Sequence, residues 1–445
     1  MRIQARHETN RNLALAAGVT VAALLLGGGG VAYGLPNALV QLVAIFALGV
    51  SFATASSFTQ RAPNPLLCLL AATVALPAIQ MLPLPPALWQ ALPGRELITS
   101  ALAAAGLELG WRPVSVHSAR TLVALLALIV PLVTVVLAFG LSRRRLQHLG
   151  WIIVGLGLVC FIWGVPQVLS EGGIALPYPE NPMPGVLFGS FANRNSTALF
   201  LVICLILALN LSVIERYAQW SLVMRGTLAV IFTTGVVLTQ SRTGIALLLI
   251  PLGMAVCRYA PQRLGRRSRS EAGWAVGLGV VLLTGVASTA VPDSRIGTAL
   301  DRFSGDDGFR TQIWEDALFT SDRYWPIGSG MGTFDEVFQV DESLEYLSPR
   351  TAGRAHNDYL ELMIEGGLPA LVILAAWLCW LAWFALKARS SIDRWIAWSG
   401  SAILFAILAQ SLLDYPLRNL ALLNVTAFAI VVLARFSVSP RESKP

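Results

Sequence analysis

The chain has 445 residues, of which 55% are hydrophobic and only 13% carry charge. A mean hydropathy of +0.66 is too high for a soluble protein of this length, so the soluble classes of protein are excluded. The five cysteines lie within apolar runs and form no CxxC pair. We therefore predict no disulfide framework, no metal site and no cofactor.

Apolar segments that can cross about 30 Å of hydrocarbon as helices recur along the whole chain. They predict an all-α polytopic membrane protein with about twelve transmembrane helices. The predicted spans are residues 13–30, 36–56, 65–82, 119–141, 149–169, 196–214, 226–241, 243–259, 273–291, 367–386, 395–413 and 418–436.

Basic residues indicate the orientation of these spans. Every segment on the side of the two termini carries Lys or Arg, including "SRRR" at 142–145 and "RLGRRSR" at 263–269. The positive-inside rule then places both termini in the cytoplasm. The net charge of +7 follows from this topology and requires no nucleic-acid partner.

Three outer segments are long enough to have structure of their own. Residues 83–118 and 170–195 are loops rich in proline, the second also in glycine, within a first membrane region, 1–291. Residues 292–366 form a 75-residue loop domain that holds 15 of the 25 acidic residues. A second membrane region with a cytoplasmic tail, 367–445, follows it.

Two amphipathic helices are predicted in the acidic loop domain. "DDGFRTQIWEDALF" has an acidic cap at position 306 or 307 and an apolar stripe from Ile313 to Leu318. "HNDYLELMIEGG" is the second, and its closing glycines predict a break before the next span. The two helices predict a helical cap over the outer ends of the bundle.

His356 is the leading candidate for chemistry. It is one of four histidines, and it lies on the outer side where a helix begins. A neutral imidazole, with a usual pKa of about 6.5, can take up a proton at neutral pH as a general base does. A polar residue that only bonds to Asn357 or Asp358 at the helix start is the alternative, and spacing leaves both open.

Arg242 lies in "LTQSRTGIALL", at the tip of a hairpin between two short spans. Each arm reaches only about 24–26 Å, less than the hydrocarbon core of about 30 Å. This places the tip beneath the outer surface, where an arginine faces a cavity or a partner, or else reaches the head groups.

Other outer arginines can bind the oxygens of a lipid-linked diphosphate, because guanidinium groups hold phosphate with paired hydrogen bonds. They are Arg95, Arg112, Arg120, Arg194, Arg310 and Arg354. As diphosphate ligands we select Arg242, Arg310, Arg354 and Arg194. The candidates for orienting the histidine or binding an acceptor are Asn357, Glu361, Asn195 and Arg95.

Four stretches in a fixed order carry a further signal. They are "GSFANRNSTA" at 189–198, "TQSRTGIALL" at 239–248, "GFRTQIWEDAL" with "PIGSGMGTF" at 308–334, and "HNDYLELMIEGGLPAL" at 356–371. With them the chain resembles the O-antigen ligase family, which also contains related polysaccharide polymerases. In this resemblance His356 matches the essential histidine, Arg242 the hairpin arginine, and Arg310 the loop arginine that precedes a tryptophan.

The resemblance implies a membrane glycosyltransferase of the helical C type in the bacterial inner membrane. Such an enzyme moves a glycan from undecaprenyl diphosphate to an acceptor hydroxyl on the periplasmic face, with inversion and without a metal. In a ligase the acceptor is lipid A–core, and in a polymerase it is another lipid-linked glycan. One dominant loop that carries the histidine favours the ligase.

A small-solute transporter is the alternative from another class, since many spans suit a permease. Against it, few charged residues lie within the spans, and no internal repeat is visible.

Overall fold

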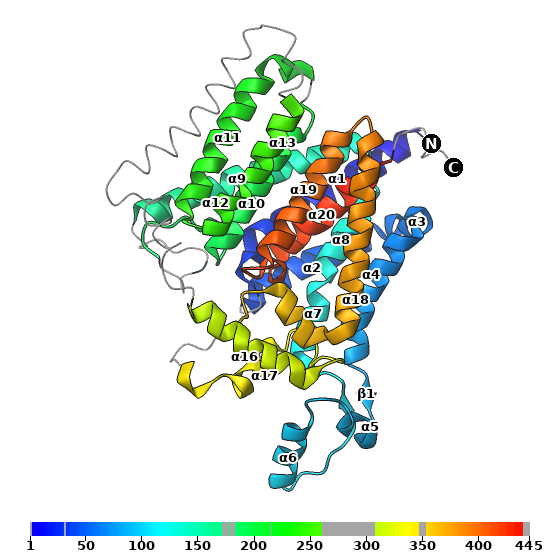
Figure 1. Cartoon of the computed structure of the whole chain (residues 1–445). Helices are drawn as coiled ribbons and strands as arrows, with labels where there is room; N and C mark the ends of the chain where they lie inside the picture. The colour runs from blue at the N-terminus through cyan, green and yellow to red at the C-terminus, as the bar shows by residue number, and fades with distance from the viewer. Residues whose placement is uncertain are drawn as a thin grey trace.

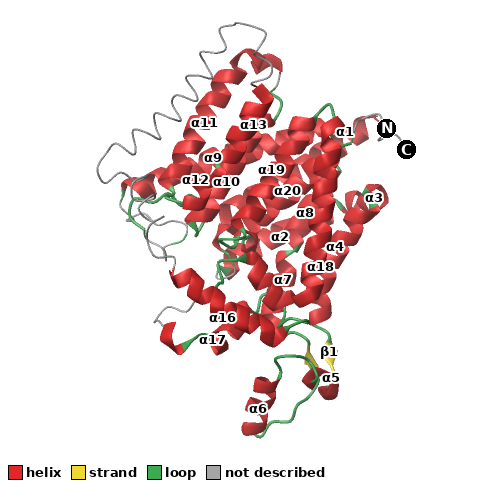
Figure 2. Ribbon diagram, in the orientation of Figure 1, coloured by secondary structure: helices red, strands yellow, loops and turns green. Residues whose placement is uncertain are grey.

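The computed structural model describes residues 2–30, 33–170, 178, 183–213, 215–259, 308–346 and 353–438. These residues are helical apart from turns, loops and a two-residue ladder, in which β1 (Pro83–Leu84) pairs antiparallel with β2 (Arg112–Pro113) (Figure 2). The predicted all-α class is therefore confirmed. The predicted span 273–291 and the helix cap at 306 or 307 lie outside the described residues.

Two helices form the centre of the bundle (Figure 1). Every residue of α10 (Arg194–Asn210) from Ser196 onward is buried, and α20 (Leu420–Phe436) packs against α19 (Arg394–Gln410) and α8 (Ile129–Phe139). A helix that is apolar on all sides must be buried, either among other helices or in a membrane. Around them, α1 (Arg2–Leu26), α9 (Arg143–Leu169), α11 (Ser221–Leu238) and α18 (Asp358–Lys387) each contact α10 or α20. Two further helices, α2 (Gly34–Val50) and α7 (Ser118–Ala127), pack against α8.

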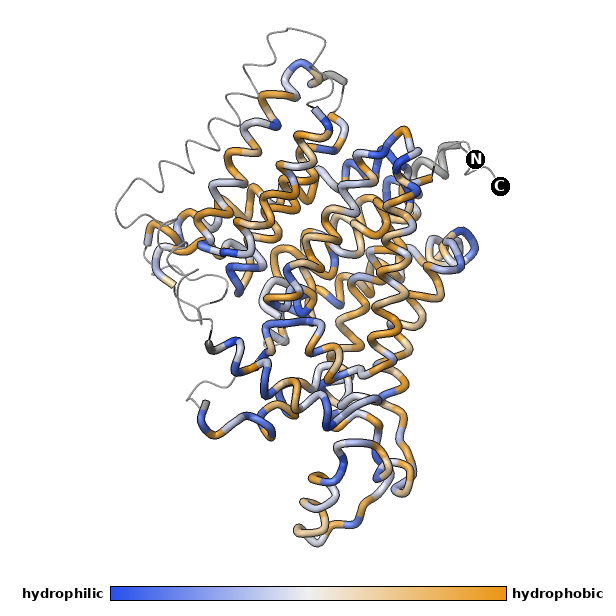
Figure 3. Tube along the Cα trace, viewed as in Figure 1, coloured by the Kyte–Doolittle hydropathy of each residue, from blue (hydrophilic) through white to orange (hydrophobic). Residues whose placement is uncertain are grey.

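Six helices in the described ranges are long and apolar enough to cross a membrane, or seven if one bent pair is counted as a span. Figure 3 shows these helices as mainly hydrophobic. Three shorter apolar helices accompany them: α10, α20 and α4 (Asn64–Gln80). The structure is thus that of a helical protein with several candidate spans, and a total of about twelve stays a prediction.

The predicted span 36–56 is not one straight helix. α2 ends at Val50, and after Ser51 the helix α3 (Phe52–Arg61) continues at an angle of 79°. The Ser51 hydroxyl donates to the Ala47 carbonyl at 2.6 Å, and the sequence that follows, "FATASSFTQR", is largely polar. The prediction of a continuous span was wrong here because the apolar pattern stops at Val50.

The helical cap at one end of the bundle consists of α16 (Gly308–Tyr324), α17 (Phe334–Asp341) and the short turn η3 (Leu344–Tyr346) (Figure 1). The predicted helix is confirmed, but its apolar stripe is only partly buried, since Leu318 is 52% exposed. The buried face of α16 includes Ile313 and Ala317 of that stripe and continues through Thr320 and Tyr324, because this spacing follows the turn of the helix.

The predicted glycine break is confirmed inside α18. Gly367 has φ of 56°, and a Cβ there would approach the carbonyl oxygen of Pro326 to 2.2 Å. Only glycine permits both the backbone conformation and this close approach.

Below α16 in Figure 1, the 83–118 loop contains α5 (Pro86–Gln90) and α6 (Glu96–Ala104).

Candidate active site

His356 lies just before α18 in a backbone conformation that is uncommon for residues other than glycine. Its φ is 51°, in the left-handed region. Asn357 caps the helix by accepting hydrogen bonds from the backbone N–H groups of Tyr359 and Leu360, at 3.0 and 3.1 Å. On the other side, the Ala355 N–H donates to Glu361 Oε1 at 3.0 Å. Neighbours on both sides hold this conformation, as is typical of functional residues.

The His356 ring faces a buried carboxylate. Its Nδ1 lies 3.4 Å from Asp414 Oδ1, and the Asp414 side chain is 1% exposed, against 32% for His356. The ring of Tyr415 lies beside the imidazole, with centroids 5.1 Å apart. Burial, with the nearby charge of Asp414, raises the pKa of Tyr415 to about 12, so its hydroxyl stays protonated. Because Nδ1 is directed at Asp414, Nε2 is left for a substrate.

A chain of hydrogen bonds connects this pair to the hairpin tip. Asn193 Nδ2 donates to both oxygens of Asp414, at 3.2 and 3.0 Å, and Asn193 Oδ1 accepts from the Asn195 N–H at 2.8 Å. The Ser241 hydroxyl then donates to Asn195 Oδ1 at 2.8 Å. Ser241 is the residue before Arg242, so the structure brings the hairpin and the histidine into one polar network.

Arg194 and Arg242 are each the first residue of a helix in this network. Arg194 begins α10, which Asn193 caps, and Arg242 begins α12 (Arg242–Leu247), which Ser241 caps. α13 (Leu249–Tyr259) continues from α12. Helix N-termini carry partial positive charge, and arginines there add full charges. The arrangement favours an anion near the His356–Asp414 pair.

Residues 353–357, which carry His356 and which we call the histidine loop, lie before α18. Trp314, one turn after Arg310 on α16, contacts this loop. The Trp314 indole Nε1 donates to the carbonyl oxygen of Ala355 at 2.8 Å. Arg310 precedes Trp314 by one turn of α16 and shares its face of the helix. This face is directed toward the loop that carries His356.

Arg354 and Glu361 belong to a buried cluster that we call the Arg418 clasp. Arg418 contacts Asp358 at 3.3 Å, Glu361 at 3.1 Å and Glu365 at 2.8 Å, and Arg354 contacts Glu361 at 3.1 Å. Burial alone would lower the pKa of Arg418, but the three carboxylates outweigh it and raise the pKa. Glu361 is wholly buried and its oxygens are engaged, which supports a role in shaping the loop.

Comparison with known proteins identifies part of the chain. Residues 227–375 match the family model described as O-Antigen ligase. This stretch is an O-antigen ligase domain. It indicates a glycan-transferring membrane protein of the ligase and polymerase family. No curated protein matches the chain.

The O-antigen ligase domain contains only part of the site. Arg242, Arg310 and His356 lie within the matched residues, whereas Asn193, Arg194 and the 411–418 loop lie outside them. Sequence reasoning missed Asp414 as the partner of His356, and it missed Arg418 altogether. The polar run "DYPLRN" between two apolar segments was the signal that could have found both.

Arg95 is not grouped with the histidine in the described part of the chain. Its guanidinium donates to the carbonyl oxygens of Pro93, Val114 and Gly328 and lies over the Trp89 ring. The side chain is wholly buried, and desolvation lowers its pKa to about 10. These contacts support a role in holding the 83–118 loop against the turn after α16.

A cavity of about 510 Å³ lies beside the O-antigen ligase domain's histidine loop, between α2, α7, α18 and the 411–418 loop. Its polar lining includes Arg120, Arg354 and Tyr359. A second cavity of about 230 Å³ shares five leucines with it and extends among α4, α8, α18, α19 and α20. The shared residues are Leu128, Leu374, Leu408, Leu417 and Leu423. The two together form a groove with a polar end and an apolar end.

Proposed function

We propose that the protein transfers a glycan from undecaprenyl diphosphate to an acceptor hydroxyl, with inversion, and that the acceptor is lipid A–core. The observation that carries the proposal is the pairing of His356 Nδ1 with the buried Asp414 carboxylate, which hydrogen bonds connect to Ser241, the cap of the helix that Arg242 begins. In this arrangement the imidazole is oriented and its opposite nitrogen is exposed to a substrate.

His356 acts as the general base. Its Nε2 accepts the proton of the acceptor hydroxyl while the oxygen attacks the anomeric carbon. The bond between that carbon and the diphosphate oxygen breaks, and its electron pair leaves with the diphosphate. Asp414 stabilises the imidazolium that forms, because its carboxylate faces Nδ1. A single displacement from the opposite side inverts the anomeric centre.

The diphosphate is bound by arginines. Arg242 and Arg194, at the beginnings of α12 and α10, and Arg310 from the cap supply fixed positive charge for the leaving group. Arg354 has a secondary role, since Glu361 already pairs with it.

A lipid-linked substrate is supported by the groove beside the histidine loop. Its apolar end, lined mainly by leucine, isoleucine and valine side chains with Trp377, suits a hydrocarbon chain. Arg354 and Tyr359 line its polar end and also neighbour His356 in sequence, so a lipid held there would bring its head group toward the base.

The orientation that we propose places the histidine end in the periplasm and both termini in the cytoplasm, in a bacterial inner membrane. The basic segments on the side of the termini support it.

One experiment tests the proposal and separates a ligase from a polymerase. The purified full chain is incubated with an undecaprenyl-diphosphate glycan, alone and together with lipid A–core, and the products are resolved by gel and mass spectrometry. A product only in the second reaction supports the ligase. Chain growth in the first indicates the polymerase, and no transfer in either would contradict the proposed chemistry.

A further inference from the structure

α3 presents one face to the bundle, near the end that carries both termini (Figure 1). Thr54, Ser57, Phe58 and Arg61 recur at the spacing of one helical face. Thr54 and Phe58 are buried, and the Phe58 ring packs edge-on against Phe139 of α8, with centroids 5.4 Å apart. The hydroxyls and the arginine of α3 are therefore held toward α8.

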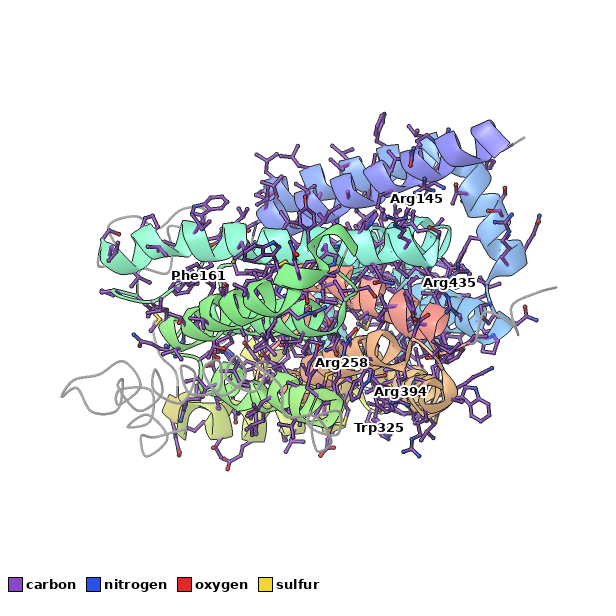
Figure 4. The ribbon with its side chains drawn as sticks, turned by 90° about the horizontal axis from the view of Figure 1, so that it is seen from above. Arg145, Phe161, Arg258, Trp325, Arg394 and Arg435 are labelled. Carbon is purple, nitrogen blue, oxygen red and sulfur yellow. The ribbon has the colours of Figure 1, made fainter. Side chains whose placement is uncertain are left out.

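A cavity of about 80 Å³ lies between this face and the ends of α8 and α20. Figure 4 shows Arg435, from the last turn of α20, next to the blue helices of the N-terminal segment. The residues that line the cavity are Thr54, Ser57, Phe58, Arg61, Phe139, Gly140 and Arg435. The volume is several times what one water requires, so a tetrahedral phosphate group has room there.

The two arginines of this cavity share it without a carboxylate, since none of the described residues that line it is acidic. Arg435 Nη2 donates to the Leu141 carbonyl oxygen at 3.3 Å, and its guanidinium lies over the Phe139 ring at 5.3 Å. These partners are uncharged. Arg143 nearby differs, because it pairs with Asp393 at 2.8 Å. Two like charges at one cavity are stabilised when an anion lies between them.

We propose that this cavity binds a phosphate group, held by Arg61 and Arg435 with help from the Thr54 hydroxyl. Thr54 Oγ1 accepts a hydrogen bond from Asn12 Nδ2 at 2.9 Å, and a hydroxyl that accepts can also donate its proton to a phosphate oxygen. The phosphate comes either from the head group of an anionic phospholipid or from solution. The proposal is independent of the glycan transfer at the other end of the bundle.

An orientation signal alone would also place arginines at this end of the bundle. It requires only that basic residues lie on this side, not that two of them line a cavity beside a hydroxyl. Arg144 provides the matched control, because it lies in the first turn of α9 at the same end, is exposed, and does not line the cavity.

The experiment uses the delipidated full-length protein in detergent and measures the thermal unfolding midpoint and the mass of bound lipid by native mass spectrometry. Short-chain phosphatidylglycerol, short-chain phosphatidylcholine and inorganic phosphate are titrated separately. The variants are Arg61→Gln, the double variant Arg61→Gln/Arg435→Gln, and Arg144→Gln. Arg61 is exposed, so its single variant should remain folded even if the double variant does not.

We expect phosphatidylglycerol to raise the midpoint of the wild type more than phosphatidylcholine does. Its apparent Kd should rise about tenfold in Arg61→Gln, as loss of a charge-assisted contact predicts, and stay unchanged in Arg144→Gln. An equal response to inorganic phosphate would identify free phosphate as the source. Equal weakening in Arg61→Gln and Arg144→Gln, or no binding of either probe by the wild type, would overturn the proposal.

Discussion

The 411–418 loop contributes to two clusters of opposite character. At one end Asp414 meets His356, which is about one third exposed and has a left-handed backbone. At the other end Arg418 meets three carboxylates of α18, and the contacts are buried. One cluster leaves a titratable ring open to a substrate, and the other compensates its charges internally.

This difference indicates that the two ends of the 411–418 loop have different roles, one in transfer and one in stability. A buried ion cluster is rigid because separating its partners leaves uncompensated charge in an apolar surrounding. Fixing the loop at Arg418 therefore fixes Asp414, and through it the His356 ring. We expect substitutions in the open pair to affect transfer and substitutions in the clasp to affect stability.

The largest effect is expected for His356→Asn. Asparagine tolerates the left-handed conformation and can still donate to Asp414, but it cannot serve as a base. Transfer should fall by at least about 10³-fold, within the range that general bases contribute. The thermal unfolding midpoint should stay near that of the wild type. Transfer within tenfold of the wild type would exclude His356 as the base.

Arg418→Gln tests the Arg418 clasp. It leaves Asp358 and Glu365 without their cation and Glu361 with Arg354 alone, which should reduce the free energy of unfolding by about 3–5 kcal/mol. The measurement is thermal or denaturant unfolding in detergent, with Arg389→Gln as the control in the helix-end turn of Ala388–Ser390. If Arg418→Gln were as stable as the wild type, the clasp would not hold the loop.

Asp414→Asn tests the His356–Asp414 pair with a smaller change in the side chain. The amide keeps the shape of the side chain but removes the charge that stabilises the imidazolium. We expect kcat to fall about 10²-fold, with KM for the donor little changed. Steady-state kinetics with varied donor would show this split. A change confined to KM would indicate that Asp414 binds substrate instead of orienting His356.

Much of this arrangement was predictable from local patterns. Runs of apolar residues predicted most of the helices, and the cap at Asn357 and the break at Gly367 follow from residue types at helix ends. The bend at Ser51, after the end of α2, was missed, because an apolar run shows how long a helix is and not where it bends.

The pairing of the site residues was not predictable in the same way. Asp414 is 58 residues from His356, and no helical spacing relates two residues that lie in different loops. Glu361 lies within the second predicted amphipathic helix, but spacing along that helix cannot show that Arg418 would contact it. The sequence also could not show that the Arg95 side chain is buried within the protein, because burial depends on the whole fold.

Arg242→Gln tests the proposed binding of the donor diphosphate near the His356–Asp414 pair. Loss of one guanidinium should raise KM for the lipid-diphosphate donor about tenfold, as the loss of one charge-assisted hydrogen bond predicts. Arg242→Lys is the matched variant, because it keeps the charge but not the paired donors. Its KM for the donor should lie between those of the wild type and Arg242→Gln. Unchanged donor kinetics in both variants would remove Arg242 from the site.

The smallest effect is expected for Trp314→Phe, which tests whether the cap supports the histidine loop. The substitution keeps an aromatic ring but removes the indole hydrogen bond to the Ala355 carbonyl, next to His356. A neutral hydrogen bond of this kind contributes about 1 kcal/mol, so we expect transfer to fall about fivefold with a small loss of stability. Trp325→Phe is the control, because Trp325 follows α16 directly and is 41% exposed. If both variants behaved alike, the contact with Ala355 would not position His356, and the open cluster would depend on the 411–418 loop alone.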